Sequence, residues 1–247
     1  VAVSRRILEV LELAMPAPVE EKKVRGKKKK GMKKKKADPR KLEVLDACLM
    51  LGKACNQVRD FEDCRRHFRR AKEGYEEQLG PDSEKTLEAT SGVIMSTGMS
   101  SHGERIDKLR ALVKRMVGAL GEENVVTLDT LNTLGWDLKQ NREFEEARKV
   151  YERCLGGQER VLGVDHKDML GTVNNLGVNY MEMKNYEKAL EYFERALKGK
   201  EKMMGKSHPS TLMTVANIAS VYAMKGNLQN AAENFKKALD GNVAQLG

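Results

Sequence analysis

The densest chemical feature of this sequence is a run of basic side chains. Residues 22–36 contain ten Lys and one Arg. Eleven positive charges attract a polyanion such as nucleic acid, an acidic lipid or the acidic tails of tubulin. No aromatic residue interrupts the run to stack on bases, and a nuclear import signal or a solubilising linker has the same composition. The candidate polyanion-binding residues are Lys27, Lys28, Lys29, Lys30, Lys33, Lys34, Lys35 and Lys36.

The residue types that serve as nucleophiles and metal ligands form no catalytic pattern. The four cysteines, Cys48, Cys55, Cys64 and Cys154, include no Cys-x-x-Cys pair. The sequence has no phosphate-binding glycine loop, no nucleophile elbow and no pair of metal ligands at helical spacing. We therefore expect reduced cysteines in a protein core, no enzyme activity, no metal and no cofactor.

Asparagine side chains recur at a fixed step along the chain. Asn132 and Asn174 are 42 residues apart, and so are Asn175 and Asn217. An amide side chain offers donors and an acceptor, so it can bond either a partner or another part of the same fold. A structural repeat of the same length would place these side chains at equivalent positions.

A second marker shows that repeat directly. Leu-Gly pairs stand at residues 79–80, 120–121, 162–163 and 246–247, with Met204–Gly205 in the remaining place. The steps between the glycines are 41, 42, 42 and 42 residues. A period of this length indicates stacked units that bury their apolar faces only against each other. We expect repeats at about 38–80, 81–121, 122–163, 164–205 and 206–247.

Each block carries the pattern of two helices. In the fourth block Gly177 lies on the apolar face of the first helix, and Phe193 lies on that of the second. A shift of 42 residues finds small and aromatic residues again at the equivalent positions, with Cys64 and Cys154 in alanine positions. Small residues let crossing helices approach each other closely. The pattern predicts an all-α fold.

The remaining segments differ from the blocks in composition. Residues 1–18 are expected to be a short helical remnant of an upstream region, and residues 19–37 a disordered Lys-rich linker. Outside residues 22–36 the sequence has 34 basic and 36 acidic residues. The net charge of +9 is therefore due to the basic run. The repeats occupy residues 38–247.

The second block departs from the others. It is one residue short, and Gly92, Gly98 and Gly103 place poor helix formers in its first half. We expect this block to be the weak unit, with the fastest backbone hydrogen exchange in residues 91–103.

The positions of small and aromatic residues resemble those of the tetratricopeptide repeat (TPR). The 42-residue period and the segments Leu-Asn-Thr-Leu-Gly at 131–135 and Val-Asn-Asn-Leu-Gly at 173–177 are similar to the kinesin light chain type of that family. The resemblance covers residues 38–247. It implies a right-handed superhelical solenoid of about five helix–turn–helix repeats, whose first helices line a concave groove.

The resemblance also implies that a peptide or partner helix binds in this groove. Inter-repeat hydrogen bonding is the alternative for the Asn side chains, and core packing is the alternative for the single Trp. The first two blocks have Met50 and Gly92 at the position of Asn175, so the last three repeats form the groove best. The candidate groove residues are Asn132, Trp136, Asn174, Asn175 and Asn217.

The sequence therefore predicts a non-enzymatic scaffold for protein–protein interaction. The resemblance implies a cargo adaptor in the cytoplasm, with kinesin heavy chain or cargo as partner, although these 247 residues contain no heptad coiled coil. Polyanion binding through residues 22–36, with a cytoskeletal or nuclear location, is one alternative. The sensor region of a larger signalling ATPase is another. No apolar run of about 18 residues is present, so we expect no membrane span.

Overall fold

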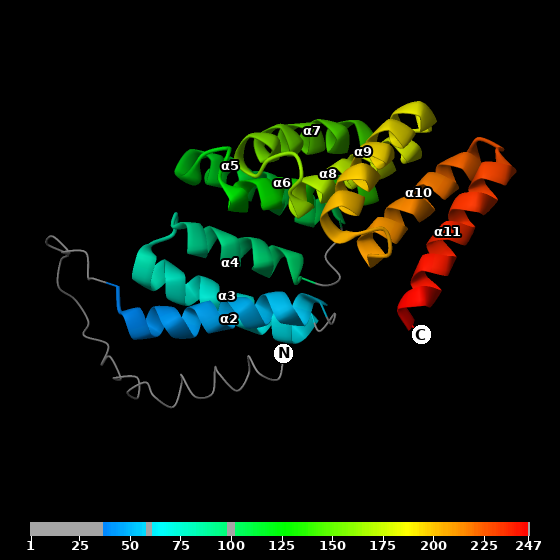
Figure 1. Cartoon of the computed structure of the whole chain (residues 1–247). Helices are drawn as coiled ribbons and strands as arrows, with labels where there is room; N and C mark the ends of the chain where they lie inside the picture. The colour runs from blue at the N-terminus through cyan, green and yellow to red at the C-terminus, as the bar shows by residue number, and fades with distance from the viewer. Residues whose placement is uncertain (1–36, 58–60, 98–101, 247) are drawn as a thin grey trace, which may run out of the picture. The chain divides into compact units, whose positions relative to one another are not determined.

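The computed structural model describes residues 37–57, 61–97 and 102–246, which form α-helices joined by turns, with no β-strand among them (Figure 1). The all-α prediction is confirmed. The expected helix in residues 1–18 and the basic run lie outside the described residues. The helices are α2 (Pro39–Gln57), α3 (Phe61–Leu79), α4 (Glu84–Met95), α5 (His102–Leu120), α6 (Val125–Gln140), α7 (Phe144–Val161), α8 (Lys167–Glu182), α9 (Tyr186–Met204), α10 (Pro209–Met224) and α11 (Leu228–Leu246).

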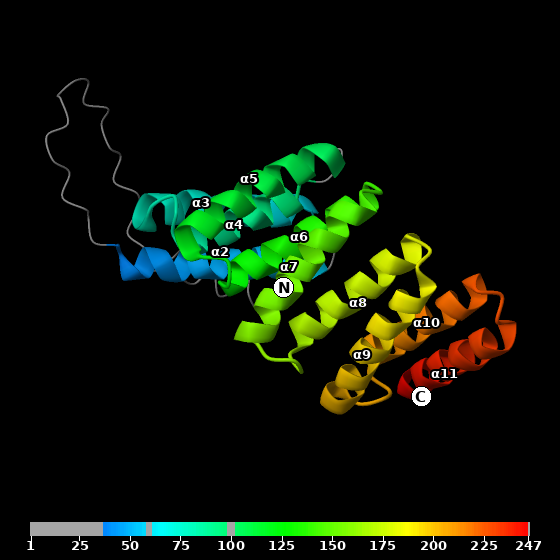
Figure 2. The same cartoon turned by 90° about the horizontal axis from the view of Figure 1, so that it is seen from above.

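The chain divides into two compact units. Of the described residues, one unit comprises those from 37 to 97 together with 114–120, and the other comprises 102–113 and 121–246. In the first unit α2 packs on α3, and α3 packs on α4. In the second unit each helix from α6 to α11 packs against the next, and α8 also contacts both α6 and α10 (Figure 2). From α6 to α11, each helix pair thus contacts the next pair in sequence, as in a repeat solenoid.

The 42-residue period is built into the joints between helix pairs. The glycine that ends each of four blocks has a positive φ of 84–93°, a conformation that terminates a helix and that glycine adopts without strain. The hydroxyls of Thr86 and Thr211 then donate to the carbonyls of Gly80 and Gly205, at 2.8 and 2.9 Å. The end of one pair therefore fixes the start of the next, which explains why glycine recurs at this spacing.

Aromatic side chains of the second helices lie directly on glycines of the first helices. A Cβ atom at Gly135 would lie 2.7 Å from the ring of Tyr151, and one at Gly177 would lie 2.7 Å from the ring of Phe193. Contacts this short are excluded in a close-packed interior. The physical reason predicted for the small residues holds in the structure.

A second set of glycines has the same role, and the sequence analysis missed it. These glycines lie on the second helices, and each faces a leucine of the first helix in its own pair. A Cβ atom there would come within 2.3–2.5 Å of a leucine Cδ2 atom. The 42-residue spacing of three of these glycines was the signal that could have revealed the set. The pairs are Gly74 with Leu45, Gly157 with Leu128, Gly199 with Leu170 and Gly241 with Leu212.

The short first helix of the second block has a specific packing partner. Helix α4 has 12 residues, whereas α6, α8 and α10 have 16 each. A Cβ atom at Gly92 would lie 2.4 Å from the ring of Phe68. Gly92 therefore weakens the helix as a residue type but is required by the contact with α3. Fast exchange in residues 91–103 stays a prediction, and residues 98–101 lie outside the described part of the chain.

An arginine takes the alanine position in α5. Arg105 is equivalent to Ala147 of α7, and its side chain is only 14% exposed. Its Nε donates to the fully buried carboxylate of Asp137 at 2.7 Å, and its Nη2 donates to the same carboxylate. In α8 the position of Asp137 is held by Asn179, whose Nδ2 donates to the Phe144 carbonyl at 2.9 Å. The same place in the repeat is therefore filled by an ion pair once and by a neutral amide once.

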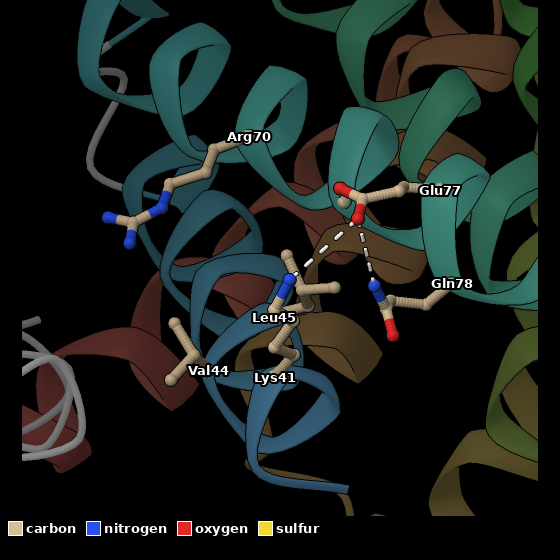
Figure 3. A pocket seen from close by; sticks show the side chains of 7 residues that line it. Lys41, Val44, Leu45, Arg70, Glu77 and Gln78 are labelled. Carbon is tan, nitrogen blue, oxygen red and sulfur yellow. Dashed lines mark hydrogen bonds and ion pairs between the residues drawn. The ribbon is translucent and has the colours of Figure 1, made fainter. Parts of the chain in front are cut away.

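The first unit has a small hollow between α2 and α3 (Figure 3). It opens beside Gly74, and Lys41 and Gln78 both reach the Glu77 carboxylate, at 3.7 and 3.3 Å. Its volume of about 120 Å³ is below the 300–1,000 Å³ typical of small-molecule sites. This hollow is therefore too small for a typical small-molecule ligand.

Candidate functional site

The partly exposed stripes of α6, α8 and α10 form the candidate site, which we call the first-helix face. Each stripe has four positions along its helix, separated by four, three and four residues, so these positions lie on one side of the helix. The three helices are neighbours, because α8 contacts both α6 and α10. The central members are Thr133 and Trp136 on α6, Asn175 and Val178 on α8, and Asn217 and Ser220 on α10.

Asparagine side chains connect these helices. The Asn175 Nδ2 donates to the Asn132 Oδ1 at 3.1 Å, and the Asn217 Nδ2 donates to the Asn174 Oδ1 at 3.3 Å. Both bonds join one first helix to the next, 43 residues away. The inter-repeat bonding considered from the sequence is therefore present in the described part of the chain.

The remaining hydrogen-bonding capacity differs within each pair. The hydroxyls of Thr172 and Thr214, which share their single protons with a carbonyl of their own helix, also lie 3.4 and 3.2 Å from the acceptor oxygens of Asn132 and Asn174, and Asn174 is buried. Asn175 and Asn217 are half-buried and use one N–H each. An amide carries two N–H donors and a carbonyl acceptor, so Asn175 and Asn217 retain a donor and an acceptor for a partner.

A buried lysine lies behind the second of these pairs. Lys200 of α9 is 3% exposed, and its Nζ donates to the Ser210 carbonyl at 3.2 Å and to the Thr214 hydroxyl at 2.9 Å. Burial lowers the pKa of Lys200 to about 8 because it disfavours the charged form. A hydrogen-bonded chain thus runs from Lys200 through Thr214 and Asn174 to Asn217. Sequence reasoning missed it, although a lysine on the buried face of a helix pattern was the available signal.

The equivalent residue one repeat earlier is neutral. Gln158 is also buried, and its Oε1 has no hydrogen-bond partner among the described residues. The two Asn pairs on the first-helix face are therefore joined by the same kind of bond, and the repeat position of Lys200 holds an uncharged amide, Gln158, one repeat earlier.

Trp136 lies on the surface of α6. It is 40% exposed, whereas Leu134 and Leu138 on the same helix are buried. The Lys139 Nζ lies 6.0 Å from the centre of the Trp136 ring, which is within the range of a cation–π contact. Burial lowers the pKa of Lys139, and Glu182 opposes this shift. The structure therefore places the indole ring where a partner could reach it.

The other candidate chemical groups have structural positions. All four cysteines are buried and none forms a disulfide, and burial raises the pKa of the Cys154 thiol to about 12. The side chains of His166 and His208 begin α8 and α10 by accepting from the amides of Asp168 and Ser210. Within the described residues, no group of three or more His, Cys, Asp or Glu side chains could hold a metal ion. The eight candidate lysines at 27–36 lie outside that part of the chain.

Comparison with family models identifies the class of protein. Two tetratricopeptide repeat models match, one over residues 127–168 and the other over residues 168–242. No curated protein sequence matches the chain. Residues 127–242 therefore carry tetratricopeptide repeats, and the fold is an all-α TPR solenoid.

Solved structures share this fold. BtubC (BKLC) from P. vanneervenii is 21% identical, with a TM-score of 0.76 over 100% of this chain and 91% of that one. A kinesin light chain-like TPR protein of Podospora anserina is 19% identical, with a TM-score of 0.67 over 83% of this chain and 97% of that one. A Rap protein in complex with Competence and Sporulation Factor is 12% identical, with a TM-score of 0.65 over 83% and 55%. At these identities the likeness concerns the fold.

The class supports a scaffold for protein–protein interaction, a role for which such folds are typically used without catalysis. None of the helices that the structure describes is both long enough and apolar enough to cross a membrane.

Proposed function

We propose that the first-helix face of α6, α8 and α10 binds a peptide or helix of a partner protein. The observation that carries this proposal is the pair of half-satisfied amides. Asn175 and Asn217 stand at equivalent positions on adjacent helices, and each retains a donor and an acceptor beside its inter-repeat bond. Two such groups on adjacent helices can bond successive peptide groups of one segment.

The roles of the five candidate residues then divide. Asn175 and Asn217 contact the partner backbone, and Asn132 and Asn174 hold these two side chains in place. Trp136 supplies apolar contact area at one end, since exposed aromatic residues are favoured anchors at interfaces. A cargo adaptor of the kinesin light chain kind, acting in the cytoplasm, fits this arrangement.

Binding of selected peptides tests the proposal. Peptides selected from a random library on the 247-residue chain would be titrated against Asn175→Ala and Asn217→Ala. We expect each substitution to weaken binding by about 0.5–1.5 kcal/mol, the value of a neutral hydrogen bond. Asn234→Ala, a half-buried asparagine on α11 whose Nδ2 donates to the Asn230 carbonyl, is the matched control and should bind as wild type.

Two further variants separate direct contact from positioning. Asn132→Ala and Asn174→Ala remove the acceptors but leave Asn175 and Asn217 in the sequence. They should weaken binding less than loss of Asn175 or Asn217. If all four substitutions lower thermal stability and none weakens binding, the asparagines serve only the stacking of repeats and the proposed site is wrong.

A second candidate function belongs to the basic run, because eleven positive charges lie within fifteen residues. Polyanion binding through residues 22–36 would depend strongly on salt. Deleting residues 19–37 should abolish most binding to heparin or to a nucleic acid duplex and leave peptide affinity unchanged. Loss of peptide binding on this deletion would assign the interaction to the basic run.

A further inference from the structure

A glycine interrupts the first-helix face where the neighbouring helices carry larger side chains. Gly171 is the first position of the stripe on α8, four residues before Asn175, and it is half-buried. The equivalent positions hold Asp129 on α6 and Met213 on α10, and both of these residues are exposed. The repeat therefore accepts a large side chain at this position and does not require glycine there.

Packing inside the chain does not explain this glycine either. On the other described first helices, and at a second position of α8, a Cβ atom added to glycine would come within 2.4–2.8 Å of an aromatic ring. A Cβ atom at Gly171 would have no neighbouring atom within 4 Å. Glycine weakens a helix interior, and it is favoured where a ligand approaches the backbone closely. The open space above Gly171, which we call the Gly171 gap, therefore points to a partner. The glycines with aromatic contacts are Gly52, Gly92, Gly135 and Gly177.

The hydrogen bonds between the first helices place a different side chain on each side of this gap. The bond that joins α8 to α6 links Asn175 to Asn132, and Gly171 and Asp129 stand one turn before these two residues. The bond that joins α10 to α8 places Met213 beside Gly171 in the same way. Because α8 lies between α6 and α10 (Figure 2), the gap has the α8 backbone as its floor and is bordered by Asp129 and Met213.

The charges of the first-helix face define what fits in the gap. The three stripes hold two acidic residues, Asp129 and Glu182, and no basic residue. Met213 is 53% exposed and offers an adaptable apolar contact. Lys167, one turn before Gly171, is basic and exposed, so a cation in the gap is directed away from it and toward Asp129. The complementary group has an apolar stem and a positively charged end, as Lys and Arg have.

We propose that the Gly171 gap receives a Lys or Arg side chain of the bound peptide, whose stem lies beside Met213 and whose charged end pairs with Asp129. This proposal rests on the function proposed for the first-helix face and narrows it, because it defines the partner as a basic segment. Gly171 is then a residue that determines specificity, since a larger side chain would fill the space that the peptide needs. Asn175, one turn away, holds the peptide backbone within reach of the gap.

Peptide selection tests the charge preference. Random peptides displayed on phage are selected on the wild-type 247-residue chain and on Asp129→Lys. We expect Lys or Arg at one fixed position of the wild-type peptides, and Asp or Glu at that position of the peptides selected on Asp129→Lys. Replacing the basic residue of a wild-type peptide by methionine keeps an apolar stem and should weaken binding about tenfold. Asp129→Asn should weaken the basic peptide by a similar factor and leave the methionine peptide unchanged.

Filling the gap is an independent test. Gly171→Leu should weaken binding of the basic peptide at least about tenfold, because the leucine side chain takes the place of the peptide side chain. Thermal unfolding should show a chain no less stable than wild type, since leucine is the better helix former. Gly118→Leu is the matched control. A Cβ atom at this glycine of α5 also meets no atom within 4 Å, but Gly118 lies outside the first-helix face, so binding should be unchanged.

Three results would overturn the proposal. The first is the absence of a fixed basic position among the peptides selected on wild type. The second is binding of a basic peptide that is insensitive to both Asp129→Asn and Gly171→Leu. The third is an equal loss of binding in Gly171→Leu and Gly118→Leu. Asn175→Ala separates these failures from failure of the first-helix face. If it still weakens binding, only the basic partner is wrong, and if it does not, the peptide binds elsewhere and both proposals fail.

Discussion

The junction at Asp137 and the junction at Asn179 occupy the same place in the repeat and are built from different chemistry. At the first, the buried Asp137 carboxylate is held by Arg105, which fills an alanine position. At the second, Ala147 keeps that position and Asn179 bonds a main-chain carbonyl. The same fold accommodates both, so the helix packing does not require either polar pair. Glycine contacts such as those of Gly135 with Tyr151 and Gly177 with Phe193 set the distance between the two helices of a pair, and the polar residue needs only a partner of its own.

The largest effect should come from breaking the charged junction. Asp137→Asn leaves the guanidinium of Arg105 mostly buried without its counter-charge, and we expect the free energy of unfolding to fall by about 3–5 kcal/mol. Urea denaturation followed by circular dichroism measures this change. The double substitution Arg105→Ala with Asp137→Asn copies the junction at Asn179 and should recover most of the loss. A double variant as unstable as the single one would contradict the comparison.

Two glycines of α8 test whether the close contacts set the packing. Gly177→Ala places a Cβ atom against Phe193 and should lower the free energy of unfolding by about 1–3 kcal/mol, because the core is already full. Gly171 has no neighbouring atom within 4 Å of such a Cβ. Gly171→Ala should therefore raise stability by about 0.5–1 kcal/mol through helix propensity. Equal effects from the two substitutions would show that packing at Gly177 is loose.

The sequence predicted the elements that repeat within a block better than the contacts that join blocks. The 42-residue period and the small and aromatic positions were sufficient to predict the helix pairs, because these depend on local helical faces. The bonds from Asn175 to Asn132 and from Arg105 to Asp137 join different blocks. Their existence depends on how adjacent helices cross, which spacing alone does not give. Lys200 was missed for the same reason, since its partners Ser210 and Thr214 come from the following block.

Lys200 and Gln158, which hold equivalent positions in successive repeats, should differ in how their contribution to the free energy of unfolding changes with pH. This effect is smaller than those above. The folded-state pKa of Lys200 is about 8, below the value of about 10.4 for a free lysine. Below pH 8 both the folded and the unfolded chain carry this proton, and the fold bears the full cost of burying the charge. As the pH rises from about 8 to about 10.4 the folded chain releases the proton first, so this residue's contribution to stability rises.

Lys200→Gln makes the site chemically equal to that of Gln158 and should remove this rise. The measurement is the difference in unfolding free energy between wild type and variant at several pH values, because other groups titrate equally in both. A difference that does not change between pH 7.5 and 10.5 would show that Lys200 is not buried as a perturbed amine.

The most direct test of the central claim uses Trp136, the single tryptophan of the chain. A selected peptide without tryptophan would be titrated while the emission of Trp136 is recorded. Binding on the first-helix face should shift the emission to shorter wavelength with the same midpoint as an independent binding assay, because the partner shields a ring that is now 40% exposed. The double variant Asn175→Ala with Asn217→Ala should move both midpoints together. Saturable peptide binding with no change in Trp136 emission and no effect of the double variant would contradict the account.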